Sequence, residues 1–240
     1  MSIAPSAGHP SVAATIRYIS AGFIGVASGR PLFDTQPASA KLALATTVSP
    51  LRITRMTQPS AADVVTFWRE AGPGKWFTRD DGFDAAIRDR FEATHYAAAR
   101  RELDGWADTP EGALALLLAL DQFPRNLFRG SAHQFATDPL ARSLAERAAA
   151  RGDRSQLDVS LARFFTLPFQ HSESLADQDR GVALCEALEA ETGDGDPLKW
   201  ARHHREIVAR FDRFPHRNRL LGRDSTAEEQ AWLDAGGFGG

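Results

Sequence analysis

The side chains best suited to chemistry in this chain are histidines and carboxylates that occur in short polar strings. His171 and Glu173 lie two residues apart, a spacing that suits either a general base with a carboxylate partner or two metal ligands. His216 directly follows a Phe-Pro step, and Asp121 precedes another such step. If these residues take part in catalysis, His171 or His216 is the best candidate for the general base. Glu173 or Asp121 is then the orienting carboxylate, and hydrolysis or proton transfer is the expected reaction.

Arginines are dense in the same strings, and their forked guanidinium groups suit the recognition of carboxylate or phosphate. The predicted ligand-binding residues are Lys75, Trp76, Arg125, Asn126, Arg129, Arg213, Arg217, Asn218 and Arg223. In this hypothesis the arginines hold a small anion, the two asparagines orient it and the tryptophan forms a wall. A second interpretation also fits, because helix C-termini leave carbonyl groups that Arg and Asn side chains can satisfy. Asp121, Glu173 and Asp212 would then pair with the arginines.

Other chemical motifs are missing from the sequence. There is no helix-borne H-E-x-x-H pair, so no metal site is predicted. There is no P-loop and no G-x-S-x-G nucleophile motif. The sequence leaves any cofactor unknown.

Helix start and stop signals recur from residue 57 onward and predict an all-α domain. Ser60, Asp80 and Thr109 can each cap a helix, and Pro110 follows the last of them. Further starts are predicted at Asp138, at Ser155 or Asp158, at Ser174, at Asp196 and at a capping box that begins at Ser225, with stops at Gly72, Gly152, Pro168 and Gly193. No segment alternates as a strand would. We therefore expect about eight helices that are joined by short loops and run antiparallel to their neighbours.

This antiparallel order predicts where the polar strings meet. Alternate helices point the same way, so their C-terminal ends share one face, and residues 74–77, 121–126, 168–173 and 212–218 should gather there. Strings 121–126 and 212–218 both read Asp, a polar residue, Phe-Pro and then Arg-Asn, with His216 inserted in the second. This similarity predicts an internal duplication of helix pairs. Proline is expected to end each helix at these steps.

Three further side-chain groups have structural interpretations. Cys185 lies among apolar residues and is expected to be a buried small hydrophobe. His204 shares a helix face with Trp200 and Ile207, so both His204 and Trp200 are expected to point inward. An inward histidine is more often a hydrogen-bonded core residue than a ligand. The glycine-rich string 236–240 is interpreted as a flexible tail.

The overall composition is that of a globular protein, with 43% hydrophobic and 25% charged residues. Of the 28 basic and 31 acidic residues, five basic and one acidic precede residue 56, which leaves 23 and 30 and a net charge of −7 for the rest. A domain of that sign is a poor general binder of nucleic acid. The single cysteine suits a reducing compartment, and no apolar run is long enough to cross a bilayer. We expect a soluble cytoplasmic protein without a membrane partner.

The first 56 residues differ from the rest, because they are rich in Ala, Ser and Thr and lack helical periodicity. Helical sequence begins directly after Met56, the only methionine besides Met1. An over-long gene prediction, a disordered tail and a targeting leader would each explain this stretch. We expect residues 1–56 to be an extension of this kind and residues 57–240 to form one helical domain.

The polar strings together resemble a known family. They are Lys75-Trp76-Phe77, Leu120 to Asn126 with Phe128-Arg129-Gly130, Pro168-Phe169 with His171-Ser172-Glu173, and Arg213 to Asn218 with Leu221-Gly222-Arg223. This combination resembles the bacterial family called domain of unknown function 924 and covers about residues 60 to 235. The resemblance implies a tetratricopeptide-like fold of stacked helix hairpins and no established activity. Asp212 departs from it, since glycine is expected there.

The sequence supports two hypotheses of function. The first is a polar pocket for a small anionic molecule, with or without catalysis. The second is a tetratricopeptide-like scaffold that binds a protein or peptide on a concave helical surface without catalysis. A nucleic-acid partner is the least favoured interpretation, because it rests on the arginines alone. The oligomeric state is not predicted.

Overall fold

A computed structural model describes residues 58–239, and within this range every regular element is a helix. The predicted all-α class is therefore confirmed, whereas the tetratricopeptide-like arrangement stays a prediction. The predictions for residues 1–56 lie outside the described residues. None of the described helices combines the length and the apolar character that a membrane span requires.

The first long helices begin at the residues whose side chains cap them. The hydroxyl of Ser60 accepts the backbone N–H of Asp63, and the Asp63 carboxylate accepts the backbone N–H of Ser60, so a capping box opens α1 (Ala61–Ala71). Asp80 caps α3 (Asp81–Ala99) and Thr109 caps α4 (Pro110–Leu117). Each of these starts agrees with the sequence prediction, because capping depends on only four neighbouring residues.

The later long helices also follow their local signals. They are α6 (Asp138–Arg151), α9 (Leu175–Thr192), α10 (Asp196–Phe211) and α11 (Ala227–Asp234). Gly152 and Gly193 end α6 and α9 in the left-handed region, with φ of 73° at both. Asp212 takes the same conformation after α10, with φ of 56°, which explains why glycine is expected there. The capping box of α11 joins Thr226 to Glu229 and so begins one residue later than predicted.

Short helices replace three of the four predicted loops, and this corrects the sequence analysis. They are α2 (Pro73–Trp76), α5 (Phe123–Leu127) and α8 (Leu167–Gln170), and a further short helix, α7 (Val159–Ala162), precedes α8. Pro124 and Pro168 lie in the first turn of α5 and α8 rather than after the end of a helix. Proline is tolerated there because the first N–H groups of a helix have no partner inside it.

The main hydrophobic core lies among α1 to α8. Helix α4 is buried along most of its length and packs against α1 and α6, as its apolar sequence predicts. Trp68, Phe91, Phe123 and Phe164 are fully buried around it. One expectation about the C-terminal part is wrong, since Trp200 is 42% exposed and does not lie inward with His204.

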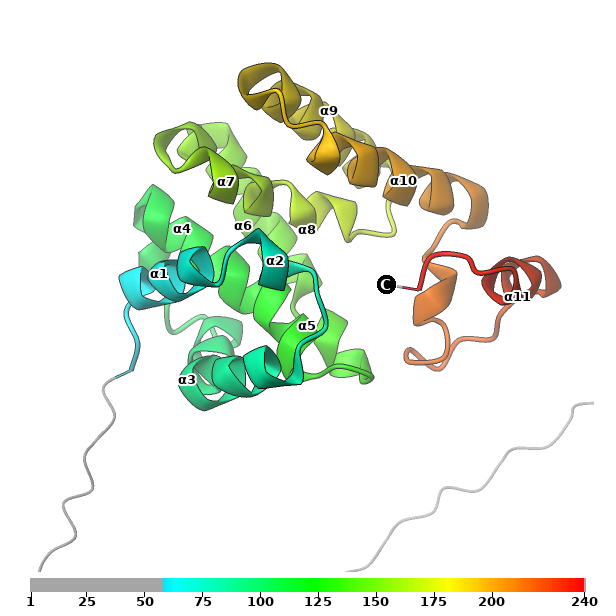
Figure 1. Ribbon diagram of the computed structural model, residues 1–240, viewed down its shortest axis with the longest axis horizontal. Coiled ribbons are helices and arrows are strands. Elements are labelled where there is room, and N and C mark those ends of the chain that lie inside the picture. The colour runs from blue at the N-terminus through cyan, green and yellow to red at the C-terminus, as the bar shows by residue number, and fades with distance from the viewer. Residues whose placement is uncertain (1–57, 240) are drawn as a thin grey trace, which may run out of the picture. The chain divides into compact units, whose positions relative to one another are not determined.

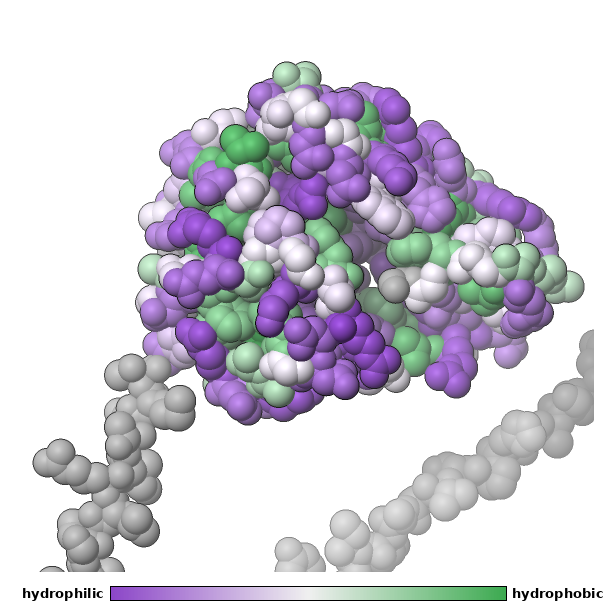
Figure 2. Space-filling model, viewed as in Figure 1, coloured by the Kyte–Doolittle hydropathy of each residue, from purple (hydrophilic) through white to green (hydrophobic). Residues whose placement is uncertain are grey.

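The C-terminal helices form a smaller part of the same unit (Figure 1). Helices α9 and α10 lie side by side, and α8 packs against both α9 and α6. After α11 the chain turns back, and its red C-terminal coil lies beside the short orange helical segment Pro215–Arg217 (Figure 1). Figure 2 shows that the face is hollowed between the α1–α8 part and this C-terminal part.

Candidate functional site

The candidate site begins at a wide helical turn that carries Asp121. Residues Leu118–Gln122 form a π-helical segment, in which the N–H of Phe123 donates to the carbonyl of Leu118 five residues earlier. The next such bond would need the N–H of residue 124, which is proline. Short π-helical turns within α-helices are frequent at functional sites. Here the wide turn follows from the Phe-Pro step that the sequence analysis singled out.

Side chains from other segments donate to two backbone carbonyl groups of this wide turn. The Nδ1 atom of His95 lies 2.8 Å from the carbonyl oxygen of Ala119. The hydroxyl of Thr137 donates to the carbonyl of Leu120 at 2.5 Å. Both donors are buried, so the widened turn is held in place by the core of the protein.

Asp121 and His171 form a buried carboxylate–imidazole pair. The Oδ1 atom of Asp121 lies 2.7 Å from Nδ1 of His171, and the side chains are 2% and 14% exposed. Arg125 and His171 oppose the burial of Asp121 and hold its pKa well below the ordinary value. An ionised carboxylate accepts hydrogen bonds only, so the Nδ1 atom of His171 carries the proton. Among the described residues, Nε2 of His171 has no hydrogen-bond partner.

The pKa of His171 is itself lowered, chiefly by burial and then by the charge of Arg125. Asp121 acts in the opposite direction but does not outweigh these two causes. The imidazole is therefore neutral at pH 7, with its lone pair on Nε2. This is the protonation state that a general base needs.

Two guanidinium groups border this pair and differ in how fully they are used. Arg125 is bidentate to Asp138, with both N–O distances 3.0 Å, and it also donates to the backbone carbonyl of Asp121. Arg217 is 7% exposed and makes one hydrogen bond, from Nη1 to the backbone carbonyl of His171 at 3.0 Å. Its distance to the carboxylate of Asp138 is 3.7 Å, and its Nε atom is buried without a partner in the described structure.

The guanidinium group of Arg217 also lies between two aromatic rings. Its central carbon is 4.5 Å from the centroid of Phe135 and 4.4 Å from that of Phe214. Burial and the charge of Arg125 lower the pKa of Arg217 to about 10, so the group remains charged at pH 7. The rings fix the plane of the guanidinium group and leave its edge available for hydrogen bonds.

Two further histidines lie beside His171. The ring of His204 is 6.3 Å from that of His171, and both His204 and His216 contact Phe214. Burial is the main cause that lowers the pKa of each to about 3, with Arg217 contributing, so both are neutral at pH 7. The Nδ1 atom of each is buried and has no partner in residues 58–239. His204 points inward as predicted, but it does not make the Nδ1 hydrogen bond expected of a core histidine.

The other predicted site residues near the C-terminus are joined in ion pairs. Glu173 is bidentate to Arg223, with N–O distances of 2.7 and 2.9 Å, and also accepts the backbone N–H of Phe214 at 2.8 Å. Arg213 is bidentate to Glu229 at 2.5 and 2.7 Å. Asn218 donates to the same Glu229 carboxylate at 3.3 Å and accepts from Arg223 at 3.0 Å. This network borders the His171 site through the backbone of residues 171–173.

The remaining predicted ligand-binding residues contact other groups. Asn126 and Arg129 both donate to Asp84 of α3, at 2.7 to 3.0 Å. Lys75 is exposed, with Nζ 3.5 Å from the carboxylate of Asp80. Trp76 is buried against Trp68 and Phe164, and its Nε1–H donates to the carbonyl of Trp68 at 2.7 Å. Asn126, Arg129, Lys75 and Trp76 thus have partners elsewhere. The predicted site residues that the structure brings together are Asp121, His171, Arg125, Arg217 and His216.

The residues that the sequence analysis missed are partners supplied by distant helices. Asp138 was interpreted only as a helix start, yet it holds Arg125. Asp84 is one of the first-turn residues of α3 and holds Arg129. Both lie at helix N-termini, where the helix dipole also favours a carboxylate. No sequence signal distinguishes a carboxylate that only stabilises a helix start from one that also pairs with an arginine.

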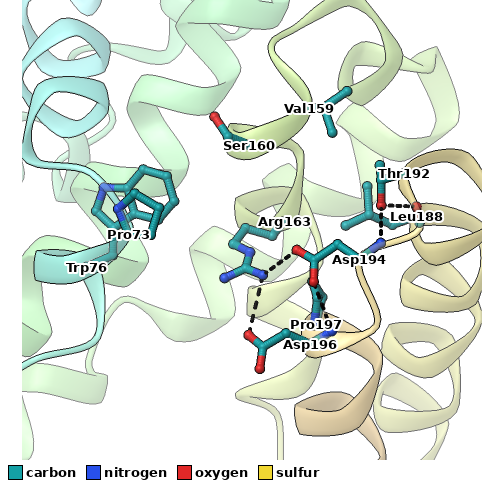
Figure 3. A pocket seen from close by; sticks show the side chains of 10 residues that line it. All are labelled: Pro73, Trp76, Val159, Ser160, Arg163, Leu188, Thr192, Asp194, Asp196 and Pro197. Carbon is teal, nitrogen blue, oxygen red and sulfur yellow. Dashed lines mark hydrogen bonds and ion pairs between the residues drawn. The ribbon is translucent and has the colours of Figure 1, made fainter.

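Two cavities open on the surface, and His171 lines neither of them. One, here named the Trp76 groove, measures about 300 Å³ and lies between α2, α7 and the start of α10 (Figure 3). In it Arg163 donates to Asp194 at 3.1 Å and lies 3.5 Å from Asp196. The other is a depression of about 550 Å³ on α10 that is lined in part by Trp200 and His203. Within the described range, no three His, Cys, Asp or Glu side chains gather as metal ligands would.

Comparison with known proteins agrees with the helical fold. The sequence profile of a family described as "Bacterial protein of unknown function (DUF924)" matches residues 64–237. A solved structure of a protein of unknown function from Agrobacterium tumefaciens is 52% identical in sequence, with a TM-score of 0.70. The similarity covers 73% of this chain and 97% of that one. No curated protein matches the chain.

Proposed function

The chain belongs to the DUF924 family, whose description states no activity, and we propose from its own residues that it binds a small anionic molecule beside His171 and activates water or a substrate hydroxyl there. The observation that carries this proposal is the Asp121–His171 pair, in which Nδ1 is oriented by a buried carboxylate and Nε2 has no partner among residues 58–239. Asp121 is the positioning residue and His171 is the general base.

Arg217 supplies the positive charge in this proposal. The four other predicted anion-binding arginines, Arg125, Arg129, Arg213 and Arg223, each have a bidentate carboxylate partner. Arg217 makes one hydrogen bond and lies 3.7 Å from an Asp138 carboxylate that Arg125 already occupies. A carboxylate or phosphate group would give this buried guanidinium a second charged partner, at hydrogen-bond distance.

Hydrolysis is the reaction that these groups support best. The Nε2 atom of His171 would take a proton from water while the resulting hydroxide attacks a carbonyl or phosphoryl centre. The leaving oxygen would then recover that proton from the imidazolium. Arg217 would stabilise the negative charge that develops on the substrate oxygen. General-base catalysis of this kind contributes about 10²–10⁴-fold to a rate.

The test measures turnover and anion binding in parallel with the full chain. p-Nitrophenyl acetate and p-nitrophenyl phosphate report hydrolysis, and inorganic phosphate and acetate report binding through thermal shift. We expect His171→Gln to lower kcat at least about 100-fold with little change in phosphate binding, and Arg217→Met to weaken that binding. His133→Gln, which alters a histidine stacked on Phe128 outside the site, is the control. A folded His171→Gln variant with wild-type turnover, or the absence of both binding and turnover, would overturn the proposal.

Peptide binding without catalysis is the second candidate function, and the Trp76 groove favours it. Phe77 and Val159 beside this groove are 57% and 60% exposed, so two large apolar side chains are available there for a partner. Asp194 and Asp196 share one guanidinium group, so the groove has spare negative charge that suits a basic peptide. Binding of arginine-containing peptides that is lost in a Phe77→Ser/Val159→Ser variant and kept in His171→Gln would favour this alternative.

A further inference from the structure

The C-terminal segment places a phenylalanine ring against the histidines of the proposed site. The ring centroid of Phe238 lies 5.0 Å from that of His204, 5.1 Å from His216 and 5.5 Å from His203. The ring centroid of Trp200 lies 6.2 Å from that of Phe238. The predicted flexible tail is therefore folded back onto α10 and the 3-10 segment in this structure.

Two glycines allow this return. Gly236 has φ of 83°, which favours glycine, and its N–H donates to the carbonyl of Leu233. A Cβ atom on Gly237 would lie 2.5 Å from a ring carbon of Trp232, so a larger residue cannot follow the same path. The tail is held chiefly by backbone hydrogen bonds to α11 and by the contacts of a single ring.

Phe238 packs against the apolar cluster of Ile207, Val208 and Phe214, and it also contacts two histidines whose hydrogen bonds are incomplete. His204 is 8% exposed, and the buried Nδ1 atoms of His204 and His216 have no partner among the described residues. A neutral imidazole has one donor and one acceptor nitrogen, and a hydrocarbon ring satisfies neither with a conventional hydrogen bond. A planar ring with nitrogen atoms at its edge, in the place of Phe238, would bring hydrogen-bonding groups beside both imidazoles.

We propose that Phe238 occupies a subsite for a heteroaromatic ring and is displaced when such a ring binds. This inference rests on the proposed function, because the subsite adjoins His171 and Arg217. The ligand class is then a nitrogen heteroaromatic ring joined to an anionic group, with the ring between His204 and His216 and the anion at Arg217. The depression lined by Trp200 and His203 provides access, since both of these residues also contact Phe238.

The test compares 2-aminopyrimidine and adenine with aniline, which has the shape of 2-aminopyrimidine without ring nitrogens. Dissociation constants are measured by calorimetry on the full chain and on Phe238→Ala. Phe238→Ala should tighten binding of both heteroaromatic probes about tenfold, because the probe no longer has to displace the phenylalanine ring. Aniline should gain less. His204→Phe in the Phe238→Ala background should abolish the gain.

Two further measurements test the subsite if Phe238→Ala is too unstable to study. Gly237→Val keeps the phenylalanine but should move the tail away, and it should tighten adenine binding as Phe238→Ala does. In the wild-type chain, adenine should raise amide hydrogen exchange at residues 236–239. Equal tightening for aniline, or unchanged affinity and exchange, would overturn the subsite. If phosphate still binds at Arg217 in that case, the proposed function survives and only this inference fails.

Discussion

The imidazoles of His171, His204 and His216 are held neutral because burial and nearby guanidinium groups disfavour the charged form. At the scale of single residues, this makes the site sensitive to mild acid. The sequence indicated that His171 and His216 could act as bases. It did not indicate their protonation states, which depend on Arg125 and Arg217 and on the depth of burial.

We predict that stability falls as the pH is lowered from 7 to 5. The folded pKa of His204 and His216 is about 3, below the unfolded value near 6.5, so the unfolded chain binds these protons first. The stabilising contribution is complete above pH 6.5 and is lost as pH falls toward 3, at up to about 1.4 kcal/mol per pH unit for each histidine. Paired carboxylates contribute only below about pH 4.5 and do not obscure this window.

Urea unfolding at pH 7, 6 and 5 measures this effect. His204→Gln should reduce the slope of this dependence, because one of the histidines with a lowered pKa is removed. A His204→Gln variant with the full wild-type slope would contradict the assignment of the pH dependence to this imidazole.

At the scale of elements, helix starts were predictable and the path between helices was not. Ser60, Asp80 and Thr109 cap helices as predicted because a cap is a local arrangement of four residues. Pro124 was expected to end a helix, but the chain continues as a π-helical turn into α5. That outcome depends on Thr137, a donor from a distant segment, which no local pattern reveals.

The duplication predicted from the two Phe-Pro strings was not tested directly, but the two copies have different conformations. Asp121 is buried in the π-helical turn and contacts His171. Asp212 is exposed in the left-handed region at the end of α10. The two aspartates thus serve different structural purposes, whereas Phe123 and Phe214 are both buried in the core.

We predict that Thr137→Val destabilises the protein by about 1–3 kcal/mol, because the buried carbonyl of Leu120 loses the hydroxyl that donates to it. The cost should be smaller in a Pro124→Ala background, because residue 124 regains an N–H that donates to the carbonyl of Leu120 if this turn takes the ordinary α-helical register. Urea denaturation of the four members of this double-mutant cycle measures the coupling. Strictly additive effects would contradict the account of the wide turn.

At the scale of the whole molecule, Glu173 links the α1–α8 part to the C-terminal part. Its carboxylate accepts from Arg223 and from the backbone N–H of Phe214, some 40 to 50 residues further along the chain. The predicted helix topology placed these polar strings at one face, and Asp121 and Arg217 do contact residue 171. It could not assign each arginine to its carboxylate, because those pairs depend on how the helices pack.

We predict that Glu173→Ala lowers the free energy of unfolding by about 2–4 kcal/mol, because the half-buried Arg223 and the Phe214 N–H lose their acceptor. Glu186→Ala removes an ion pair with Arg202 in which both side chains are more than half exposed, and it should change stability by less than about 1 kcal/mol. Chemical denaturation of both variants gives the comparison. Equal effects would mean that the link between the two parts is no stronger than a surface ion pair.

The most direct test of the proposed site is the ¹⁵N NMR spectrum of the histidine side chains in the full chain. His171→Gln assigns the resonance. We predict a neutral ring at pH 7 with the proton on Nδ1, and a change in the Nε2 shift when inorganic phosphate is added, absent in Arg217→Met. Two results would contradict the proposal that His171 is a general base beside an anion site. One is a ring that is protonated on Nε2, and the other is a ¹⁵N spectrum that does not change with any anion tested.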